Sequence, residues 1–187
     1  MSSSLMHALV FVPTALAAAL AMDLWAAFLH GRVWHRTLWF IHASHHEARR
    51  GRFEANDVLS VTHAPFAIAF ILYGCIAPPT VTREIVFGAG LGMTLFGLAY
   101  LIVHDGLVHH RLPVRFLLRS RYLRAVVRAH LVHHTGLSGG PPYGFVLGPL
   151  ELRRADRSRA PESDDPRGAT HSRSTSRGPL RVPKGQR

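Results

Sequence analysis

The stretch that decides the fold lies at residues 85–109 and reads IVFGAGLGMTLFGLAYLIVHDGLVH. Residues 85–103 are apolar or small, and they make up about the 20 residues that an α-helix needs to cross a bilayer. Four glycines in this run offer a flat face for close helix packing: Gly88, Gly90, Gly92 and Gly97. The run ends in a histidine motif, so the sequence predicts a membrane helix that carries histidines to one side of the bilayer.

Two further segments upstream have the hydropathy of membrane helices. Residues 5–29 are apolar apart from one histidine and Asp23. Residues 64–77 are apolar but short, and they reach spanning length when the helix begins near residue 57, where Asn56 or Asp57 would be a good N-cap. A cleaved signal peptide is the alternative for the first segment. No positive charge precedes that segment, however, and cleavage would detach the histidines that follow it.

A fourth segment, residues 113–128, contains five arginines, and desolvating so many charges is too costly for a membrane span. An amphipathic helix at the membrane interface fits better, with its apolar side chains turned inward. These inward side chains are Phe116, Leu117, Leu123 and Val127. We therefore expect an all-α integral membrane protein with three to four transmembrane helices.

The order of these segments places the histidine motifs on one side of the membrane. If residues 5–29, 57–77 and 85–103 each cross once, the loop at 30–56 and everything from residue 104 onward share a side. Most of the arginines lie on that side too, and positive residues favour the cytoplasmic face. We therefore expect a histidine-rich helical cap on the cytoplasmic side of a bacterial inner membrane.

The composition changes sharply after Leu152. The chain has 187 residues and a formal net charge of +11, and residues 153–187 are rich in Arg, Ser, Pro and Gly. Such a segment is typical of a disordered basic tail, so we divide the chain into a membrane domain at 1–152 and a tail at 153–187. No aromatic residue follows Phe145 to stack on bases, which argues against a nucleic-acid partner. With one cysteine, Cys75, an intrachain disulfide is excluded, and so are thiolate iron–sulfur and zinc-finger sites.

Histidine is unusually frequent, with 14 residues, and ten of them form four motifs. In chain order the motifs read HX4H, HX2HH, HX4H and HX2HH. Their histidines are His30 and His35; His42, His45 and His46; His104 and His109; and His130, His133 and His134. The same two-part pattern therefore occurs twice, once after each helix that leads to this side of the membrane.

The spacing within each motif has a geometric meaning. In HX2HH the first and last histidines are four residues apart on one face of an α-helix, and the middle one joins them, so three imidazoles can converge from one turn. In HX4H the two histidines are about 140° apart around an α-helix, so they need a helix end or a kink to face one ion. Gly31 and Gly106 are placed to allow that change of direction.

Ten neutral imidazoles exceed the three or four ligands of a zinc site, and they suit two metal ions with about five ligands each. Imidazole binds iron, copper, nickel and zinc alike, so the ligand type alone does not choose the metal. Asp105 would either accept a hydrogen bond from a ligand imidazole or cap a helix. Three histidines outside the motifs are expected to be hydrogen-bonded core residues: His7, His63 and His171.

The motifs and their flanking residues resemble the β-carotene hydroxylases of the fatty-acid hydroxylase superfamily. The similarity covers roughly residues 20–152 and includes the segments 51–57 (GRFEAND), 104–109 (HDGLVH) and 142–145 (PYGF). By position, the resemblance implies that all ten motif histidines are ligands of two iron ions. The family often has a residue other than histidine where this chain has His110, so His110 would either be an alternative ligand or point away from the site.

The resemblance implies a non-haem di-iron monooxygenase that hydroxylates carbon 3 of the β-ionone rings and turns β-carotene into zeaxanthin through β-cryptoxanthin. Dioxygen would be the co-substrate, and a ferredoxin-type donor fed by NAD(P)H would supply electrons. An apolar substrate explains a site tied to the lipid bilayer. Trp34, Trp39 and Phe40 would line a path from lipid to metal or form an interfacial aromatic belt. Three loop arginines would set the topology or dock the donor: Arg49, Arg50 and Arg52.

Two alternatives remain open from the sequence. A carotenoid ketolase, or a fatty-acid or sterol hydroxylase or desaturase, would use the same motifs to form another product. A membrane metal transporter is the non-enzyme alternative, but transport needs polar ligands near the middle of the bilayer. The motif histidines lie instead at helix ends and beyond, on one side.

Overall fold

Helices make up all the regular structure in the residues that the computed structural model describes, which are 3–47, 51, 53–135 and 140–159. The elements are α1 (Ser3–Met6), η1 (His7–Phe11), α2 (Val12–Leu29), η2 (His30–Trp34), α3 (Trp39–His46), α4 (Asp57–Ser60), α5 (Ala64–Ile76), α6 (Val81–Tyr100), η3 (Leu101–Val108), η4 (Arg115–Arg119), α7 (Arg121–His134) and α8 (Gly148–Arg159). The first three η elements are π-helices and η4 is a 3-10 helix. The prediction of an all-α fold is confirmed.

Three helical stretches are long and apolar enough to cross a membrane: His7–Trp34, Asp57–Ile76 and Val81–Val108. They match the three predicted spans. The first and third are longer than predicted, because α2 and α6 continue without a break into η2 and η3. These π-helical continuations carry the two HX4H motifs.

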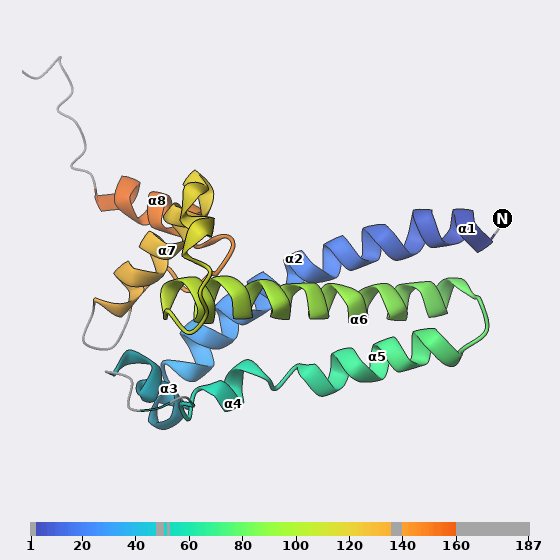
Figure 1. Ribbon diagram of the computed structural model, residues 1–187, viewed down its shortest axis with the longest axis horizontal. Helices are drawn as coiled ribbons and strands as arrows, with labels where there is room; N and C mark the ends of the chain where they lie inside the picture. The colour runs from blue at the N-terminus through green and yellow to red at the C-terminus, as the bar shows by residue number, and fades with distance from the viewer. Residues whose placement is uncertain (1–2, 48–50, 52, 136–139, 160–187) are drawn as a thin grey trace, which may run out of the picture.

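The three stretches lie side by side, with α6 between α2 and α5 (Figure 1). The N-terminus and the α5–α6 connection lie at one end, and α3, α7 and α8 lie at the other (Figure 1). Each motif histidine belongs to η2, α3, η3 or α7, or directly follows one of them. All ten therefore lie at the same end of the molecule, which confirms the predicted co-location of the motifs.

Glycines allow α6 to approach both of its neighbours closely. A Cβ atom at Gly88 would lie 2.7 Å from a carbonyl oxygen of the N-terminal helix, and Gly92 meets the backbone of the same helix. A Cβ at Gly90 would lie 2.8 Å from a Cβ atom of α5, whereas Gly97 has no neighbour within 4 Å. The predicted close helix packing is confirmed at Gly88, Gly90 and Gly92, which serve two different helix contacts, but not at Gly97.

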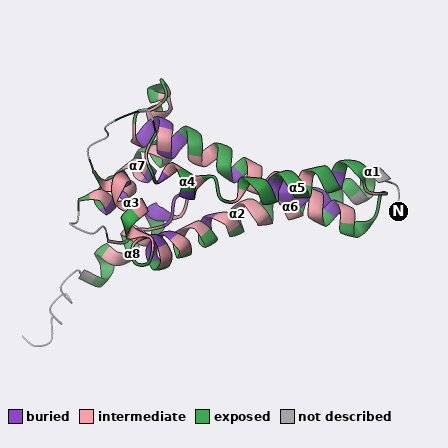
Figure 2. Ribbon diagram, turned by 90° about the horizontal axis from the view of Figure 1, so that it is seen from below, coloured by how far each residue is buried: buried purple, intermediate pink, exposed green. Residues whose placement is uncertain are grey.

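Large apolar side chains cover the outside of the three stretches. Leu16, Phe66 and Ile76 are 65%, 60% and 83% exposed. Exposed residues recur along α2, α5 and α6 (Figure 2). Exposed apolar surface of this extent suits a lipid environment rather than water.

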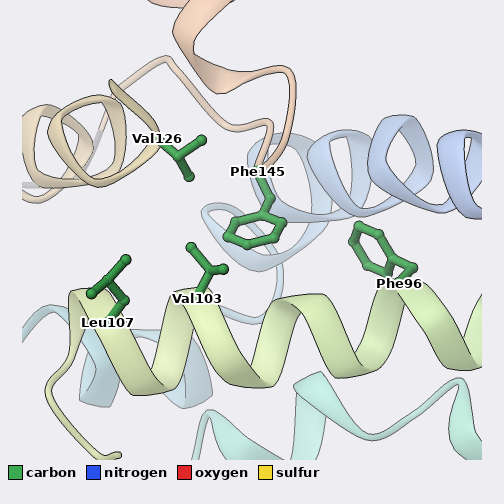
Figure 3. Close-up of a cluster of buried hydrophobic side chains, with 5 residues drawn as sticks. All are labelled: Phe96, Val103, Leu107, Val126 and Phe145. Atoms are coloured by element: carbon green, nitrogen blue, oxygen red, sulfur yellow. The ribbon is translucent and has the colours of Figure 1, made fainter. Parts of the chain in front are cut away.

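The arginine-rich segment at 113–128 does not form a span. It contains η4 and the first half of α7. Leu117, Leu123 and Val127 pack inward as predicted, but the prediction for Phe116 is wrong, since this side chain is 62% exposed. The three inward side chains pack against a buried cluster that joins α6, η3, α7 and the segment before α8 (Figure 3). The cluster consists of Phe96, Val103, Leu107, Val126 and Phe145.

The predicted boundary at residue 152 falls inside a helix. α8 runs from Gly148 to Arg159, so helical structure continues past Leu152. Residues 160–187 lie outside the described part of the chain, and so does His171. The three loop arginines are also outside it: Arg49, Arg50 and Arg52.

Candidate metal centre

Both HX4H motifs lie on π-helical turns. The backbone N–H of His35 donates to the His30 carbonyl oxygen at 3.0 Å, and that of His109 donates to the His104 carbonyl oxygen at 3.0 Å. With i→i+5 hydrogen bonds, residues that are five positions apart in the sequence lie on successive turns of the helix. The two histidines of each motif therefore share a face. The predicted departure from a straight α-helix is confirmed, and it takes the form of a π-turn.

Gly31 and Gly106 lie inside these π-turns, and the helix does not break at either residue. A Cβ atom at Gly31 would lie 2.7 Å from the ring of Tyr143, and one at Gly106 would lie 2.9 Å from Val114 Cγ2. Both glycines therefore make room for a neighbouring side chain. The change of direction expected at these positions comes from the wider π-turn.

Five histidines from η2 and the residue that follows it, α3 and α7 converge on one point, and we call them the first histidine group. They are His30, His35, His42, His46 and His133, and one ligand nitrogen of each lies within 4.8 Å of the others. The Nε2 atoms of His30 and His42 are 3.0 Å apart, and those of His35 and His133 are 3.1 Å apart. These four rings thus meet through the same nitrogen, Nε2.

Four histidines form a second histidine group beside the first. They are His45, His109, His130 and His134, again with one nitrogen of each within 4.8 Å of the others. Nε2 of His130 lies 2.8 Å from Nε2 of His134 and 3.4 Å from that of His109. His104 borders this group, since its Nε2 atom is 3.1 Å from Nε2 of His45 and 3.1 Å from the Tyr100 hydroxyl.

Each HX2HH motif divides its histidines between the two groups. His42 and His46, four residues apart, belong to the first group, while His45 belongs to the second. In α7 the middle histidine, His133, crosses over in the same way and joins the first group. Adjacent residues on an α-helix point about 100° apart, so the middle side chain is directed to a neighbouring site. The prediction that three imidazoles of one turn converge is wrong.

The nitrogen distances suit metal ions. A pair of neutral imidazoles can share at most one proton, and here several Nε2 atoms meet at one point. Ligand atoms about 2.1 Å from an ion and at right angles to each other lie about 3 Å apart, which matches the observed contacts. His46 supports the same conclusion, because both of its ring nitrogens are buried and have no hydrogen-bond partner.

Burial keeps these imidazoles neutral. Removal from water, with a smaller contribution from neighbouring histidines, lowers the pKa of His42 and His133 to about 4. The same causes lower the pKa of His46 and His134 to about 3 and that of His109 to about 2. Neutral imidazole is the form that binds metals, so both groups are in the binding form at neutral pH.

Two motif histidines are oriented by side-chain acceptors. Nδ1 of His42 donates to Asn56 Oδ1 at 2.7 Å, and Nδ1 of His104 donates to Asp105 Oδ1 at 2.7 Å. The sequence left two roles open for Asp105, and the structure places it beside the imidazole. Asn56 does occupy the N-cap position of α4, but its side chain makes no capping bond. In both pairs Nε2 stays available for an ion.

Two histidines of the first group are oriented by main-chain carbonyls. Nδ1 of His30 donates to the Tyr143 carbonyl oxygen at 3.2 Å, and Nδ1 of His133 donates to the Gly140 carbonyl oxygen at 2.6 Å. Both acceptors belong to the segment between α7 and α8. That segment therefore contributes to the site although it carries no motif histidine.

A largely buried arginine ties the carboxylates of the site together. Arg111 donates to Glu54 at 3.0 Å and to Asp57 at 2.7 Å, and it lies 3.9 Å from Asp105. Glu54 Oε2 is in turn 3.6 Å from Nδ1 of His45. Sequence reasoning missed this network. Its only sequence signal was the position of Glu54 and Asp57 in the family-like segment 51–57.

An apolar cavity of about 360 Å³ lies between the three membrane helices. Met22 and Ala67 are among its apolar lining residues, and Trp34 and Tyr100 line it nearer the motifs. The Tyr100 hydroxyl is 3.1 Å from Nε2 of His104. The cavity therefore ends beside the histidine groups.

The three aromatic residues near the motifs have different surroundings. Trp34 lines the cavity. Trp39 packs against the rings of His35 and His46, with centroid distances of 5.3 Å in both cases. Phe40 is 76% exposed. Only Trp34 therefore fits the predicted path between lipid and metal, and exposed Phe40 fits the interfacial alternative.

The remaining described histidines lie outside both groups. His110 follows the second π-turn with a positive φ of 56°, and it belongs to neither group. His7 donates to Glu84 at 2.8 Å, and His63 accepts from Trp25 at 2.9 Å. Both are hydrogen-bonded as predicted, but neither is buried.

Comparison with known proteins adds independent information. The family model described as fatty acid hydroxylase matches residues 15–151. The chain is 49% identical over 135 residues to "Beta-carotene 3-hydroxylase 2, chloroplastic" of Arabidopsis thaliana. The aligned region covers 72% of this chain and 44% of the relative. No solved structure matches.

Two more distant relatives extend the similarity. An algal "Beta-carotene 3-hydroxylase, chloroplastic" of Haematococcus lacustris is 42% identical, over 72% of this chain and 42% of its own length. "Beta-carotene hydroxylase" of Pantoea ananas is 36% identical, over 80% of this chain and 87% of its own length. The chain thus spans less than half the length of the plant and algal relatives and most of the bacterial one.

Proposed function

The chain belongs to the fatty acid hydroxylase family, and on that premise we propose that it is a β-carotene 3-hydroxylase that works in a membrane. The observation that carries the proposal is the pair of histidine groups at the end of an apolar cavity between membrane helices. A hydrophobic ring in that cavity would lie next to the metal centre. The names of relatives from plants, an alga and a bacterium support a carotenoid as the substrate.

The proposed cofactor is a pair of iron ions, one in each histidine group. The ligands would be the ten motif histidines, with His104 completing the second group: His30, His35, His42, His46 and His133 for one ion, and His45, His104, His109, His130 and His134 for the other. When bound, iron would supply the redox chemistry that activates dioxygen and removes a hydrogen atom from an unactivated C–H bond. Imidazole ligands are compatible with iron, and the family membership favours it over other metals.

The proposed reaction replaces one C–H bond at carbon 3 of a β-ionone ring with C–OH. One oxygen atom of dioxygen enters the substrate, and the other leaves as water after two electrons and two protons are consumed. Two rounds convert β-carotene to β-cryptoxanthin and then to zeaxanthin. A ferredoxin-type protein fed by NAD(P)H is the proposed electron donor. Exposed arginines of η4 and α7 would suit an acidic donor: Arg115, Arg121 and Arg128.

The residues of the chain would have separate tasks in this reaction. The apolar cavity would bind the ring and exclude water, and its volume lies in the range of ordinary small-molecule sites. Trp34 and Tyr100 would bring the ring toward the histidine groups, because both line the cavity at that end. Asn56 and Asp105 would keep His42 and His104 in the orientation that presents Nε2.

Product analysis tests the substrate and the reaction. Bacterial cells that accumulate β-carotene should form β-cryptoxanthin and zeaxanthin when they express this chain. Canthaxanthin instead would indicate a ketolase. Unchanged β-carotene, with the protein present in the membrane, would reject the carotenoid as substrate.

Metal analysis tests the centre separately from the product. Protein purified without oxygen should contain about two iron ions per chain, and H133A should lose at least one of them together with the product. Metal flux into vesicles without oxygen-dependent turnover would instead support a transporter.

A further inference from the structure

Asp23 is a buried carboxylate in the apolar part of the first membrane stretch. Asp23 lies in α2, two helical turns before His30, and is only 1% exposed. An ionisable side chain inside a membrane helix is expensive and is usually kept for a function. Sequence reasoning had noted Asp23 only as an interruption of the apolar run.

Asp23 holds the segment that joins α7 to α8. Its Oδ1 atom accepts the backbone N–H groups of Phe145 at 3.1 Å and Val146 at 2.8 Å, and Oδ2 accepts that of Leu147 at 2.9 Å. Three charge-assisted hydrogen bonds satisfy the carboxylate and fix three consecutive peptide units. These bonds link residues more than 120 positions apart in the chain.

The fixed segment reaches the first histidine group. The Tyr143 and Gly140 carbonyls, two and five residues before Phe145, accept the Nδ1 protons of His30 and His133. The Tyr143 ring also packs 5.5 Å from the ring of His35. Each of these contacts involves a histidine of the first group.

A second carboxylate also holds this segment. Glu151 of α8 accepts the backbone N–H of Tyr143 at 2.8 Å and that of Gly144 at 3.1 Å. Glu151 is half-buried and lies outside the membrane stretches. The segment is therefore anchored both by a membrane helix and by the C-terminal helix of the described chain.

We propose that Asp23 is a positioning residue for the metal ion of the first histidine group. It acts through the 143–147 backbone, which sets the carbonyls that orient His30 and His133. The proposal rests on the metal centre of the proposed function. It also predicts that loss of Asp23 weakens binding of only one of the two ions, because these contacts involve histidines of the first group alone.

Iron titration of chelator-treated protein tests the proposal. In D23N an amide NH₂ group replaces one acceptor oxygen and faces backbone N–H donors, so the segment loses its anchor. We expect binding to the first group to weaken about 10- to 100-fold, the usual cost of removing an orienting partner. Two double variants show which group is affected. H134A damages the second group and retains the first, so adding D23N to it should remove the remaining tight binding. H42A damages the first group, so adding D23N to it should not change the binding that remains.

A matched carboxylate and a milder variant control the experiment. Glu84 is also buried in a membrane stretch, but it pairs with His7 and Arg83 at the other end, so E84Q should retain both ions. E151Q should weaken the same position as D23N. Unchanged binding in folded D23N, equal loss from both groups, or the same loss in E84Q would overturn the proposal. If D23N does not fold, unchanged binding in E151Q overturns it, whereas a wild type that binds no iron rejects the metal centre itself.

Discussion

Adjacent histidines in α3 serve different sites, and this division has a direct consequence at the scale of single residues. His45 belongs to the second histidine group and His46 to the first. In the proposed metal centre, replacing either one would therefore remove a ligand from one position and leave the other position complete. The two alanine variants change adjacent residues, but we expect each to lose a different ion.

We expect H45A and H46A each to retain about one iron ion per chain, because only one ligand set is damaged in each. Metal analysis gives the stoichiometry, and Mössbauer spectra of the two variants should show two different remaining sites. Identical spectra, or complete metal loss in both variants, would contradict the division between the groups.

The lowered pKa values predict how the metal-free protein responds to acid. The pKa of His42 and His133 falls to about 4 on folding, from an unfolded value near 6.5. Between these values the unfolded chain binds more protons than the folded one. The stabilising contribution is therefore complete above about pH 6.5 and is lost as the pH falls toward 4, by up to about 1.4 kcal/mol per pH unit for each histidine.

Thermal unfolding of chelator-treated protein checks this response. The midpoint should fall as the pH is lowered from 7.5 to 5, and H42Q should reduce the slope because one titrating group is gone. A midpoint that is independent of pH over this range would show that the histidine groups are not held neutral by burial.

Much of the site at residue scale was predictable, because the motif spacing identified all ten histidines that the structure brings together. Their partition was not predicted. Helical spacing turns the middle histidine of each HX2HH motif away from the outer two, but only the tertiary arrangement of α3 and α7 shows that a second site lies there. The roles of Asp23 and Arg111 were not predicted either, because they too depend on the tertiary structure. Their partners lie far away in the sequence, and each looks locally like an isolated charge.

At the scale of elements, the contact between α6 and the N-terminal helix depends on small residues. Gly92 lies against the backbone of that helix, and an added Cβ has no room there. Overpacking a close contact costs about 1–3 kcal/mol. Gly97 lies in the same helix with open space around it, so it provides a matched control.

We expect Gly92→Ala to lower the thermal midpoint of the protein in detergent and Gly97→Ala to leave it nearly unchanged. Both variants add the same methyl group to the same helix, so helix propensity cancels between them. Equal midpoints for the two variants would mean that the close contact does not contribute to stability.

The membrane stretches were predicted well because length and hydropathy are local properties of the sequence. The C-terminal ends of the first and third stretches were predicted too early, because polar histidines interrupt the apolar pattern while the helix continues as a π-turn. Hydropathy does not register a change of helix type. The spacing of five residues in HX4H did carry that information, and it indicated that a straight α-helix would not suffice.

At the scale of the whole molecule, the arrangement predicts that the α5–α6 connection and α8 lie on opposite sides of the membrane. Pro79 lies in the connection and Ser158 lies in α8, and both are exposed. The arginines near the motifs favour the cytoplasm for the α8 side.

A labelling experiment checks this topology. In a Cys75→Ser background, Pro79→Cys should react with a membrane-impermeant maleimide on intact bacterial cells, and Ser158→Cys should react only after permeabilisation. The reverse pattern would place the histidine groups on the outer side. Equal labelling of both variants on intact cells would contradict a three-span arrangement.

The division of each HX2HH motif between two groups also determines when the site can be assembled. The first group takes four histidines from the first 46 residues but needs His133. The second takes His45 from early in the chain but otherwise depends on residues from His104 onward. Neither ligand set is complete until α7 has been synthesised and has docked against α3. Loading of the proposed metal centre would thus be coupled to completion of the helical body, and an unfinished chain at the ribosome would hold no finished binding site.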